Sequence, residues 1–297
     1  MHLAELLRPR LGVQVLFDFA DATEAVAFAA AHRLAVLELN LGNVHFLQQL
    51  ASARERTRIR AACRQHNVAM ALHAWEGPSF FITNERVRRC GVTELKRLLN
   101  QAADIGVANV VMHLGHDMNY GTSTGTGFTH QQYPDYYRSM LTELLLELKD
   151  HAGRTTRLCV ENVGGFRYNL TFRVLDQVLG GSLGLCLDIG HLNTLPQAPQ
   201  ARELAFFKKH RTLVFHSHVH DNSGKRDEHQ VLGRGNIDFM PFFRLLARTS
   251  ALVVFEVRPR EAALQCLSYY KHRIEPTLSR LRARSARNSG TAAKTKA

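Results

Sequence analysis

The 297-residue sequence lacks any apolar run of the roughly eighteen uncharged residues needed to cross a bilayer. Its first twelve residues, MHLAELLRPRLG, place Glu5 and two arginines within a short apolar stretch, and no small-residue cleavage site follows. We therefore expect no secretory signal. The five cysteines are scattered and form no CxxC pair, so we expect reduced thiols in a cytoplasmic protein, with no thiolate metal site.

Acidic residues are scarce relative to basic ones, with 26 Asp and Glu against 38 Lys and Arg, which gives a net charge of +12. Residues 271–297 hold eight Lys or Arg and one Glu, so much of the excess lies at this end. Such a basic, Ser- and Ala-rich end is usually a solvated extension and only a weak argument for nucleic-acid binding. We predict a single catalytic domain over residues 1–273 and a basic, disordered tail over residues 274–297.

Short apolar runs rich in β-branched residues alternate with amphipathic segments along the chain. Continuously apolar strands are typical of a parallel sheet that helices cover on its buried faces. The Gly-rich turn that follows the first strand of a dinucleotide-binding open sheet is missing, which disfavours that alternative. Eight runs with a helix after nearly every one predict an α/β fold, a (β/α)₈ TIM barrel. The predicted strands are Val13–Phe19, Ala35–Leu41, Val68–Ala74, Asn109–Leu114, Leu158–Val163, Leu183–Ile189, Leu213–Val219 and Leu252–Val257.

A histidine or carboxylate stands at the end of six consecutive predicted strands. In a parallel barrel these ends converge on one mouth, where active sites are built. A carboxylate within an apolar strand is costly to bury unless it is paired or binds a metal ion. Imidazole and carboxylate together suit a divalent ion such as Zn²⁺, Mn²⁺, Co²⁺ or Mg²⁺ and do not select among them. The candidates are His73, His113, Glu161, Asp188, His191, His218 and Glu256, with Asp227 and His229 in the loop after the seventh strand.

These motifs resemble the xylose-isomerase-like TIM-barrel superfamily, which includes sugar phosphate isomerases and epimerases and also endonuclease IV. The resemblance runs from about Val13 to Pro259 and is strongest in HVHDNSGKRDEHQVLGRGNIDF. It implies that Glu161, Asp188, His218 and Glu256 hold a divalent metal ion. It further implies that a multinuclear cluster would add five ligands, which are His73, His113, His191, Asp227 and His229.

One hypothesis is a metal-dependent isomerase or epimerase of a sugar or sugar phosphate. The resemblance implies proton transfer next to a carbonyl through a metal-stabilised enediolate, with Glu161 and Glu256 as the acid/base pair. Arg258 and Lys225 are candidates for holding a phosphate or hydroxyls, and Trp75, with Phe80 and Phe81, for an apolar wall over the substrate. The ketose-epimerase members carry an arginine where this chain has Gly224, which argues against a specific ketose 3-epimerase assignment.

The alternative hypothesis is an endonuclease IV-like, multinuclear zinc phosphodiesterase acting on abasic DNA. The complete ligand set favours it. The loop HAWEGPSFF argues against it, because a DNA-binding face needs basic residues and none follows until Arg86. We therefore place the isomerase first, with a small-molecule partner, no membrane, and nucleic acid only under the alternative. Assembly of the chain into a homo-oligomer is left open.

Overall fold

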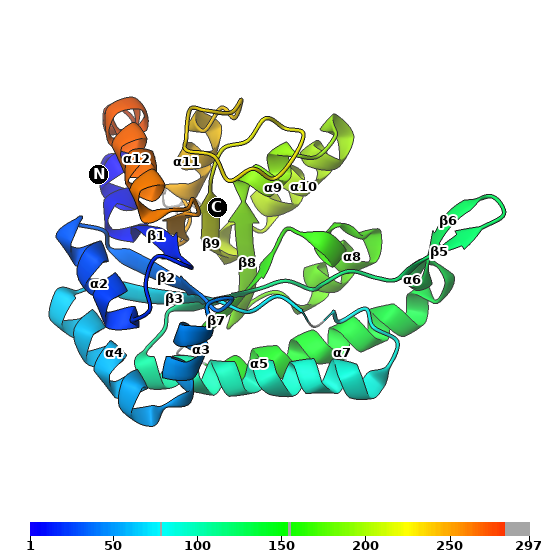
Figure 1. The fold of residues 1–297 in the computed structure, drawn as a ribbon. Helices are drawn as coiled ribbons and strands as arrows, with labels where there is room; N and C mark the ends of the chain where they lie inside the picture. The colour runs from blue at the N-terminus through cyan, green and yellow to red at the C-terminus, as the bar shows by residue number, and fades with distance from the viewer. Residues whose placement is uncertain (78, 154–155, 283–297) are drawn as a thin grey trace, which may run out of the picture.

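Eight parallel strands close into a barrel at the centre of the molecule (Figure 1). The computed structural model describes residues 1–77, 79–153 and 156–282. Around the barrel the strands follow the order β1-β10-β9-β8-β7-β4-β3-β2, and this arrangement confirms the predicted (β/α)₈ fold. The strands are β1 (Leu11–Val15), β2 (Val36–Asn40), β3 (Ala69–His73), β4 (Asn109–Met112), β7 (Arg157–Glu161), β8 (Leu183–Asp188), β9 (Val214–Val219) and β10 (Leu252–Phe255).

Helices cover the outside of the barrel, and α5 has a capping residue at each end. The side chain of Asn84 accepts a hydrogen bond from the Val87 amide at the start of α5, and Gly106 ends that helix with φ of 87°. The covering helices are α2 (Ala22–Ala31), α3 (Val44–Ala51), α4 (Ala53–His66), α5 (Glu85–Ile105), α7 (Pro134–Ala152), α8 (Asn169–Val178), α10 (Gln197–Lys209), α11 (Met240–Leu246) and α12 (Arg260–Tyr269).

The first strand lies earlier in the chain than the sequence predicted, since β1 covers Leu11–Val15 in place of Val13–Phe19. Gly12 explains the shift, because a Cβ at this position would lie 2.3 Å from the carbonyl oxygen of Val36 on β2. The glycine thus lets the two strands approach closely. Phe17, which the prediction placed inside the strand, is 80% exposed.

Several elements were not predicted, among them helix α3 and a hairpin after β4. Helix α3 follows β2 directly and buries Phe46 and Leu50. The long polar segment after β4 contains a hairpin of β5 (Asn119–Thr122) and β6 (Gly125–Phe128) that projects away from the barrel (Figure 1). The residues of β5 are exposed and those of β6 exposed or half-buried.

The folded domain extends past the predicted boundary at residue 273. Helix α13 (Glu275–Arg280) packs against α1 (Leu3–Leu7), and the amide of Leu3 donates to the carbonyl of Leu281 at 3.0 Å. Leu278 is fully buried, so residues 275–280 belong to the domain and not to a tail. The rest of the predicted tail, residues 283–297, lies outside the described residues. Within the described part of the chain, the helices are too short or too polar to cross a membrane.

Candidate metal centre

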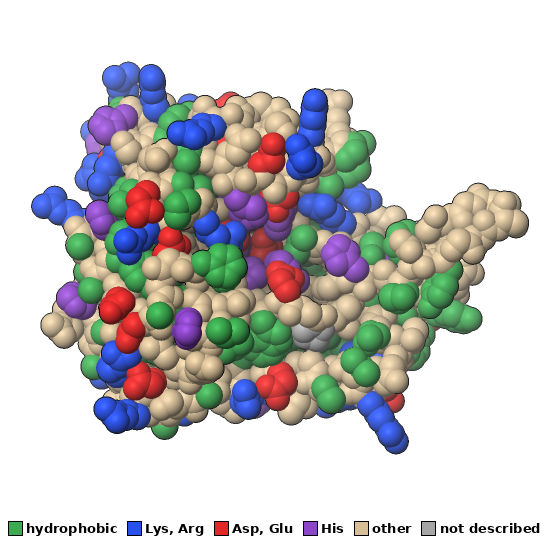
Figure 2. Space-filling model, viewed as in Figure 1, with side chains coloured by type: hydrophobic (Ala, Val, Ile, Leu, Met, Phe, Trp, Pro, Cys, Tyr) green, Lys and Arg blue, Asp and Glu red, His purple; other side chains and the backbone are tan. Residues whose placement is uncertain are grey.

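The histidine and acidic side chains gather in a hollow where the strands end (Figure 2). Strand register places them there: His218 on β9 is level with Asp188 on β8, while Glu161 is the last residue of β7. Glu256 follows the last residue of β10. All nine residues that the sequence singled out as ligands fall into groups whose donor atoms lie within 4.8 Å of one another.

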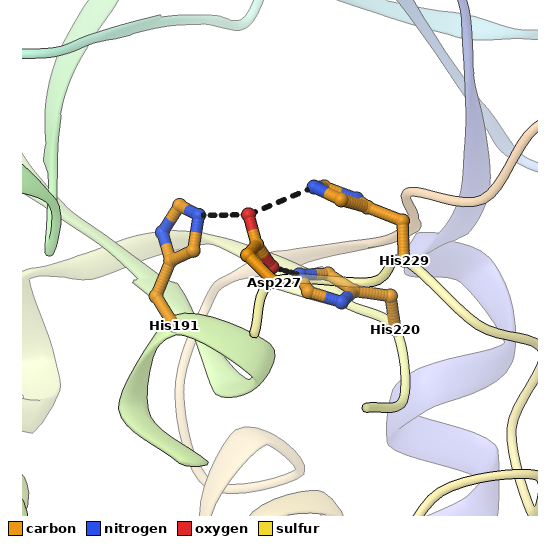
Figure 3. A group of neighbouring side chains, drawn as sticks. All are labelled: His191, His220, Asp227 and His229. Carbon is orange, nitrogen blue, oxygen red and sulfur yellow. Dashed lines mark hydrogen bonds and ion pairs between the residues drawn. The ribbon is translucent and has the colours of Figure 1, made fainter. Parts of the chain in front are cut away.

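Five overlapping groups can be distinguished among the described residues, and three of them together contain all nine predicted ligands. Each of these three groups offers imidazole nitrogens and carboxylate oxygens, the donor types that suit Zn²⁺ and related ions. The central group is Glu161, Asp188, His218 and Glu256; the His73 group is His73, Glu76 and His113; and the outer group is His191, His220, Asp227 and His229 (Figure 3).

Glu161 connects the three groups. Its Oε2 lies 3.2 Å from Nε2 of His73 and 2.9 Å from Nε2 of His113. Its Oε1 lies 3.2 Å from Nδ1 of His191 and 3.3 Å from Nδ1 of His218. One carboxylate thus faces an imidazole of every group, and it could contribute to holding more than one ion.

In four of these histidines, one ring nitrogen faces Glu161 or Asp227 and the other ring nitrogen has a hydrogen-bond partner of its own, as is common in metal-bound histidines. Nδ1 of His73 contacts the carbonyl of Ala74 at 2.8 Å, and Nδ1 of His113 contacts Glu76 at 3.0 Å. Nδ1 of His229 contacts the carbonyl of Glu256 at 2.9 Å. Nε2 of His218 lies 3.0 Å from Oε1 of Glu38. When this second nitrogen donates a hydrogen bond, the first nitrogen of a neutral ring presents a lone pair to Glu161 or Asp227.

A lone pair about 3 Å from a carboxylate oxygen requires a proton or a cation between the two. Burial alone would raise the pKa of Glu161, but the charges of His218 and His113 hold that pKa well below its usual range. Burial would lower the pKa of His113, whereas Glu161 and Glu76 raise it to about 10. Nδ1 of His191, although buried, has no aligned hydrogen bond among the described residues. The donor set therefore fits divalent cations, which would take the place of these protons.

A cavity of about 430 Å³ opens onto the groups, lined among others by Glu161, His191, Glu256 and Arg258. Nη2 of Arg258 donates to Oε1 of Glu256 at 3.1 Å and also to Gln14. The structure thus places Arg258, one of the predicted substrate-binding residues, at the cavity wall.

The other predicted substrate contacts lie elsewhere. Trp75 lines two neighbouring hollows, one of them with Glu76 and His113, and is absent from the described lining of the main cavity. Lys225 is exposed in the loop after β9 and is likewise outside that lining. Phe80 and Phe81 are buried; Phe80 lines the hollow that Trp75 shares with Glu76 and His113, and neither phenylalanine is in the described lining of the main cavity.

Sequence reasoning missed four residues of the centre: Glu38, Glu76, His216 and His220. Glu38 is fully buried on β2, where its two oxygens contact His216 at 2.7 Å and His218 at 3.0 Å. The signal that pointed to Glu161, a carboxylate inside an apolar strand, is present in VLELN as well. His216 and His220 were left unassigned, yet His216, His218 and His220 are all fully buried.

Residues 26–271 match the family described as Xylose isomerase-like TIM barrel. The chain belongs to this family. The similar curated proteins include the uncharacterized protein MJ1311 of Methanocaldococcus jannaschii, 26% identical over a match that covers 53% of this chain and about half, 52%, of the relative. The probable endonuclease 4 of Mycobacterium tuberculosis is 26% identical over 73% of this chain and 82% of the relative.

Solved structures share the fold over nearly their whole length. A D-tagatose 3-epimerase-like protein superposes with a TM-score of 0.70 and 22% identity, covering 91% of this chain and 98% of the other. The 3-keto-D-glucoside 4-epimerase YcjR of E. coli gives 0.67 and 18%, covering 88% and 98%. The TTHB071 protein of Thermus thermophilus, soaked with ZnCl2, gives 0.66 and 20%, covering 91% and 98%. At these identities the likeness establishes the barrel.

Proposed function

We propose that this chain is a divalent-metal-dependent isomerase or epimerase that moves a proton at a carbon next to a carbonyl in a sugar or sugar phosphate. The cavity carries the proposal. It has a volume of about 430 Å³, which suits a small molecule, and it presents both Glu161 and Glu256. Among its described lining residues, Arg258 is the one Lys or Arg.

The two carboxylates flank the central group. Strands β8 and β9 separate β7 from β10 in the barrel, so Asp188 and His218 lie between Glu161 and Glu256. Carboxylates on two sides of a bound sugar can take a proton at one position and return one at another. Arg258 is placed to bind a hydroxyl or phosphate oxygen. A bound divalent ion supplies the positive charge that stabilises the oxygen on which negative charge develops.

Both carboxylates would combine proton transfer with ligation, as the family resemblance implies. Glu256 shares its oxygens between His218, at 3.1 Å from Oε2, and Arg258, at 3.1 Å from Oε1. The guanidinium thus keeps one oxygen of Glu256 directed to the cavity. The names of the similar epimerase structures support the choice of a sugar as the substrate class.

A phosphodiesterase is the second candidate. The three groups whose histidines Glu161 contacts favour it, as does the similarity to the probable endonuclease 4. Duplex DNA, however, is held mainly through contacts of Lys and Arg with several phosphates. The single Arg258 in the described lining provides one such contact, so we place the small-molecule activity first.

The test compares proton exchange with DNA cleavage in protein purified without chelators. In D₂O, we expect NMR to show deuterium entering the carbon next to the carbonyl of a ketose, aldose or sugar phosphate. Glu161→Gln and Glu256→Gln should each lower this exchange by at least roughly 100-fold, the usual contribution of an acid or base. Glu261→Gln, which changes an exposed acid on α12, is the matched control. Cleavage of an abasic duplex by the wild type, without exchange into any sugar, would establish the phosphodiesterase instead.

A further inference from the structure

The outer group contains a histidine that the predicted ligand set did not include. His220 directly follows β9 and is fully buried. Its Nε2 lies 3.5 Å from Oδ1 of Asp227 and 3.2 Å from Oδ2 of Asp188. Figure 3 shows three imidazoles, those of His191, His220 and His229, directed at the carboxylate of Asp227.

The other two rings approach the second oxygen of the same carboxylate. Nε2 of His191 and Nε2 of His229 each lie 3.1 Å from Oδ2 of Asp227. Ligand atoms of all four residues lie within 4.8 Å of one another. These side chains come from α9 (Ile189–Asn193), the end of β9 and the following loop, so the tertiary fold brings them together.

The backbone is shaped around the His220 ring. A Cβ at Gly190 would lie 1.9 Å from Cε1 of His220, so only a glycine at position 190 leaves room for the imidazole. On its other side the ring stacks on His229, with centroids 4.0 Å apart and planes at 18°. Nδ1 of His220 has no hydrogen-bond partner among the described residues, so the ring meets its polar partners through Nε2.

We propose that His220 is a metal ligand and that it completes a four-ligand site with His191, Asp227 and His229. The inference rests on the proposed metal-dependent function and assigns a distinct role to one of its ions. Three imidazoles and one carboxylate fill the four positions that Zn²⁺ takes in closed, structural sites. The ion of the outer group would then hold the loop after β9 in place.

This assignment leaves the substrate to the other ions. A three-ligand site keeps a position open for water or substrate, whereas a four-ligand site does not. By this count the His73 group, which has three ligands, would keep the open position, beside Glu161 and the cavity. Such a division suits a small sugar held at one end of the hollow better than a phosphodiester clamped by every ion of a cluster.

The test counts metal ions and leaves activity aside. Wild type, His220→Asn and the control His45→Asn, an exposed histidine on α3, are loaded with Co²⁺ and titrated with a competing chelator. Elemental analysis gives the stoichiometry, and the Co²⁺ absorption spectrum reports the coordination of each ion. We expect His220→Asn to lose one ion per chain at a chelator concentration where the wild type and His45→Asn keep it, with affinity for that ion lowered at least roughly 100-fold. The remaining ions should stay bound.

A second variant separates ligation from a role in orienting Asp188. His191→Asn should remove the same ion, and the His191→Asn/His220→Asn double variant should lose no further one. Circular dichroism confirms that each variant is folded. If His220→Asn keeps every ion with unchanged affinity and spectrum, the inference fails while the proposed function stands. If His220→Asn instead loses the ion of the central group, the role of His220 is to orient Asp188, and the inference is overturned. A wild type that binds no ion refutes the proposed function itself.

Discussion

Glu38 is a buried carboxylate that sets which ring nitrogen of His218 carries the proton. Its Oε1 accepts a hydrogen bond from Nε2 of Gln14 at 2.7 Å and lies 3.0 Å from Nε2 of His218. Nδ1 of the same His218 faces Glu161 and Glu256. Burial alone would raise the pKa of Glu38, yet His218 and His216 hold it well below its usual range. A charged acceptor at this point keeps the proton of His218 on Nε2 and leaves Nδ1 free for the central group.

Replacing Glu38 tests this role. Glu38→Gln removes the charge but little volume, and we expect it to weaken metal binding at the central group by roughly 10- to 100-fold. Glu38→Ala leaves two buried imidazoles without their partner, so it should also lower the free energy of unfolding of the metal-free protein by about 3 kcal/mol. Chelator competition and urea unfolding measure the two effects. Glu94→Gln, on the exposed face of α5, is the control and should change neither quantity; unchanged metal affinity in Glu38→Gln would contradict the role.

At the scale of elements, the short helix α9 links two of the groups. Asp188 caps it by accepting a hydrogen bond from the amide of His191 at 2.6 Å, so one carboxylate serves both the helix and the central group. Asn162 supports this junction, since its side chain donates to the carbonyl of Asp188 at 2.9 Å and to Glu203 at 2.7 Å. The motif CLDIGH is therefore a connection between groups as well as a source of ligands.

Gly190→Ala tests whether α9 positions His220. The added Cβ would overlap the imidazole, so we expect the outer group to bind its ion at least roughly tenfold more weakly, and the protein to lose about 1–3 kcal/mol of stability through overpacking. Chelator competition and thermal unfolding provide the measurements. Gly121→Ala on the β5–β6 hairpin is the matched control, because nothing lies within 4 Å of a Cβ there. Equal affinity for every ion in Gly190→Ala and wild type would show that α9 does not fix the ring.

Element prediction from sequence succeeded where an apolar run is buried on all sides and failed where a local contact decides. The eight strands were found because each is a short apolar run followed by a helix. The first was displaced because only the approach of Gly12 to Val36 shows where pairing begins. Helix α3 is amphipathic but only 8 residues long and comes soon after β2, so its pattern was too short to stand out. The β5 strand of the hairpin is exposed and polar, so no apolar pattern reveals it.

At the scale of the whole molecule, several buried carboxylates share one barrel mouth, and the metal-free protein compensates them with imidazolium groups. Burial would lower the pKa of His229, but Asp227 and Glu256 raise it to about 9. The pKa of His113 is raised to about 10 by Glu161 and Glu76 against the same effect of burial. An unfolded histidine titrates near about 6.5. The stability contributed by these imidazoles is thus fully present below about pH 6.5 and lost as the pH rises through the folded values.

We therefore expect the Tm of the metal-free protein to fall between about pH 6.5 and 10. Metal ions displace these protons, so the rise in Tm on adding Zn²⁺ should grow over the same interval. At a free Zn²⁺ concentration of 100 times Kd, one bound ion should raise the free energy of unfolding by about 2.7 kcal/mol. Thermal unfolding with a chelator, and with Zn²⁺ in excess, measures both curves. A metal-free Tm that does not change over this interval would show that the histidines are not paired with the carboxylates as described.

The sequence by itself determined the barrel and most of the candidate ligands, because the ends of parallel strands must meet at one mouth and polar residues there are visible as interruptions of apolar runs. Only the tertiary structure decided which ligands share a group. His216, His218 and His220 follow one another at the same period, yet register places the first beside Glu38, the second in the central group and the third beside Asp227. Depth within the barrel separates them, and depth depends on how neighbouring strands are paired, which no local pattern records.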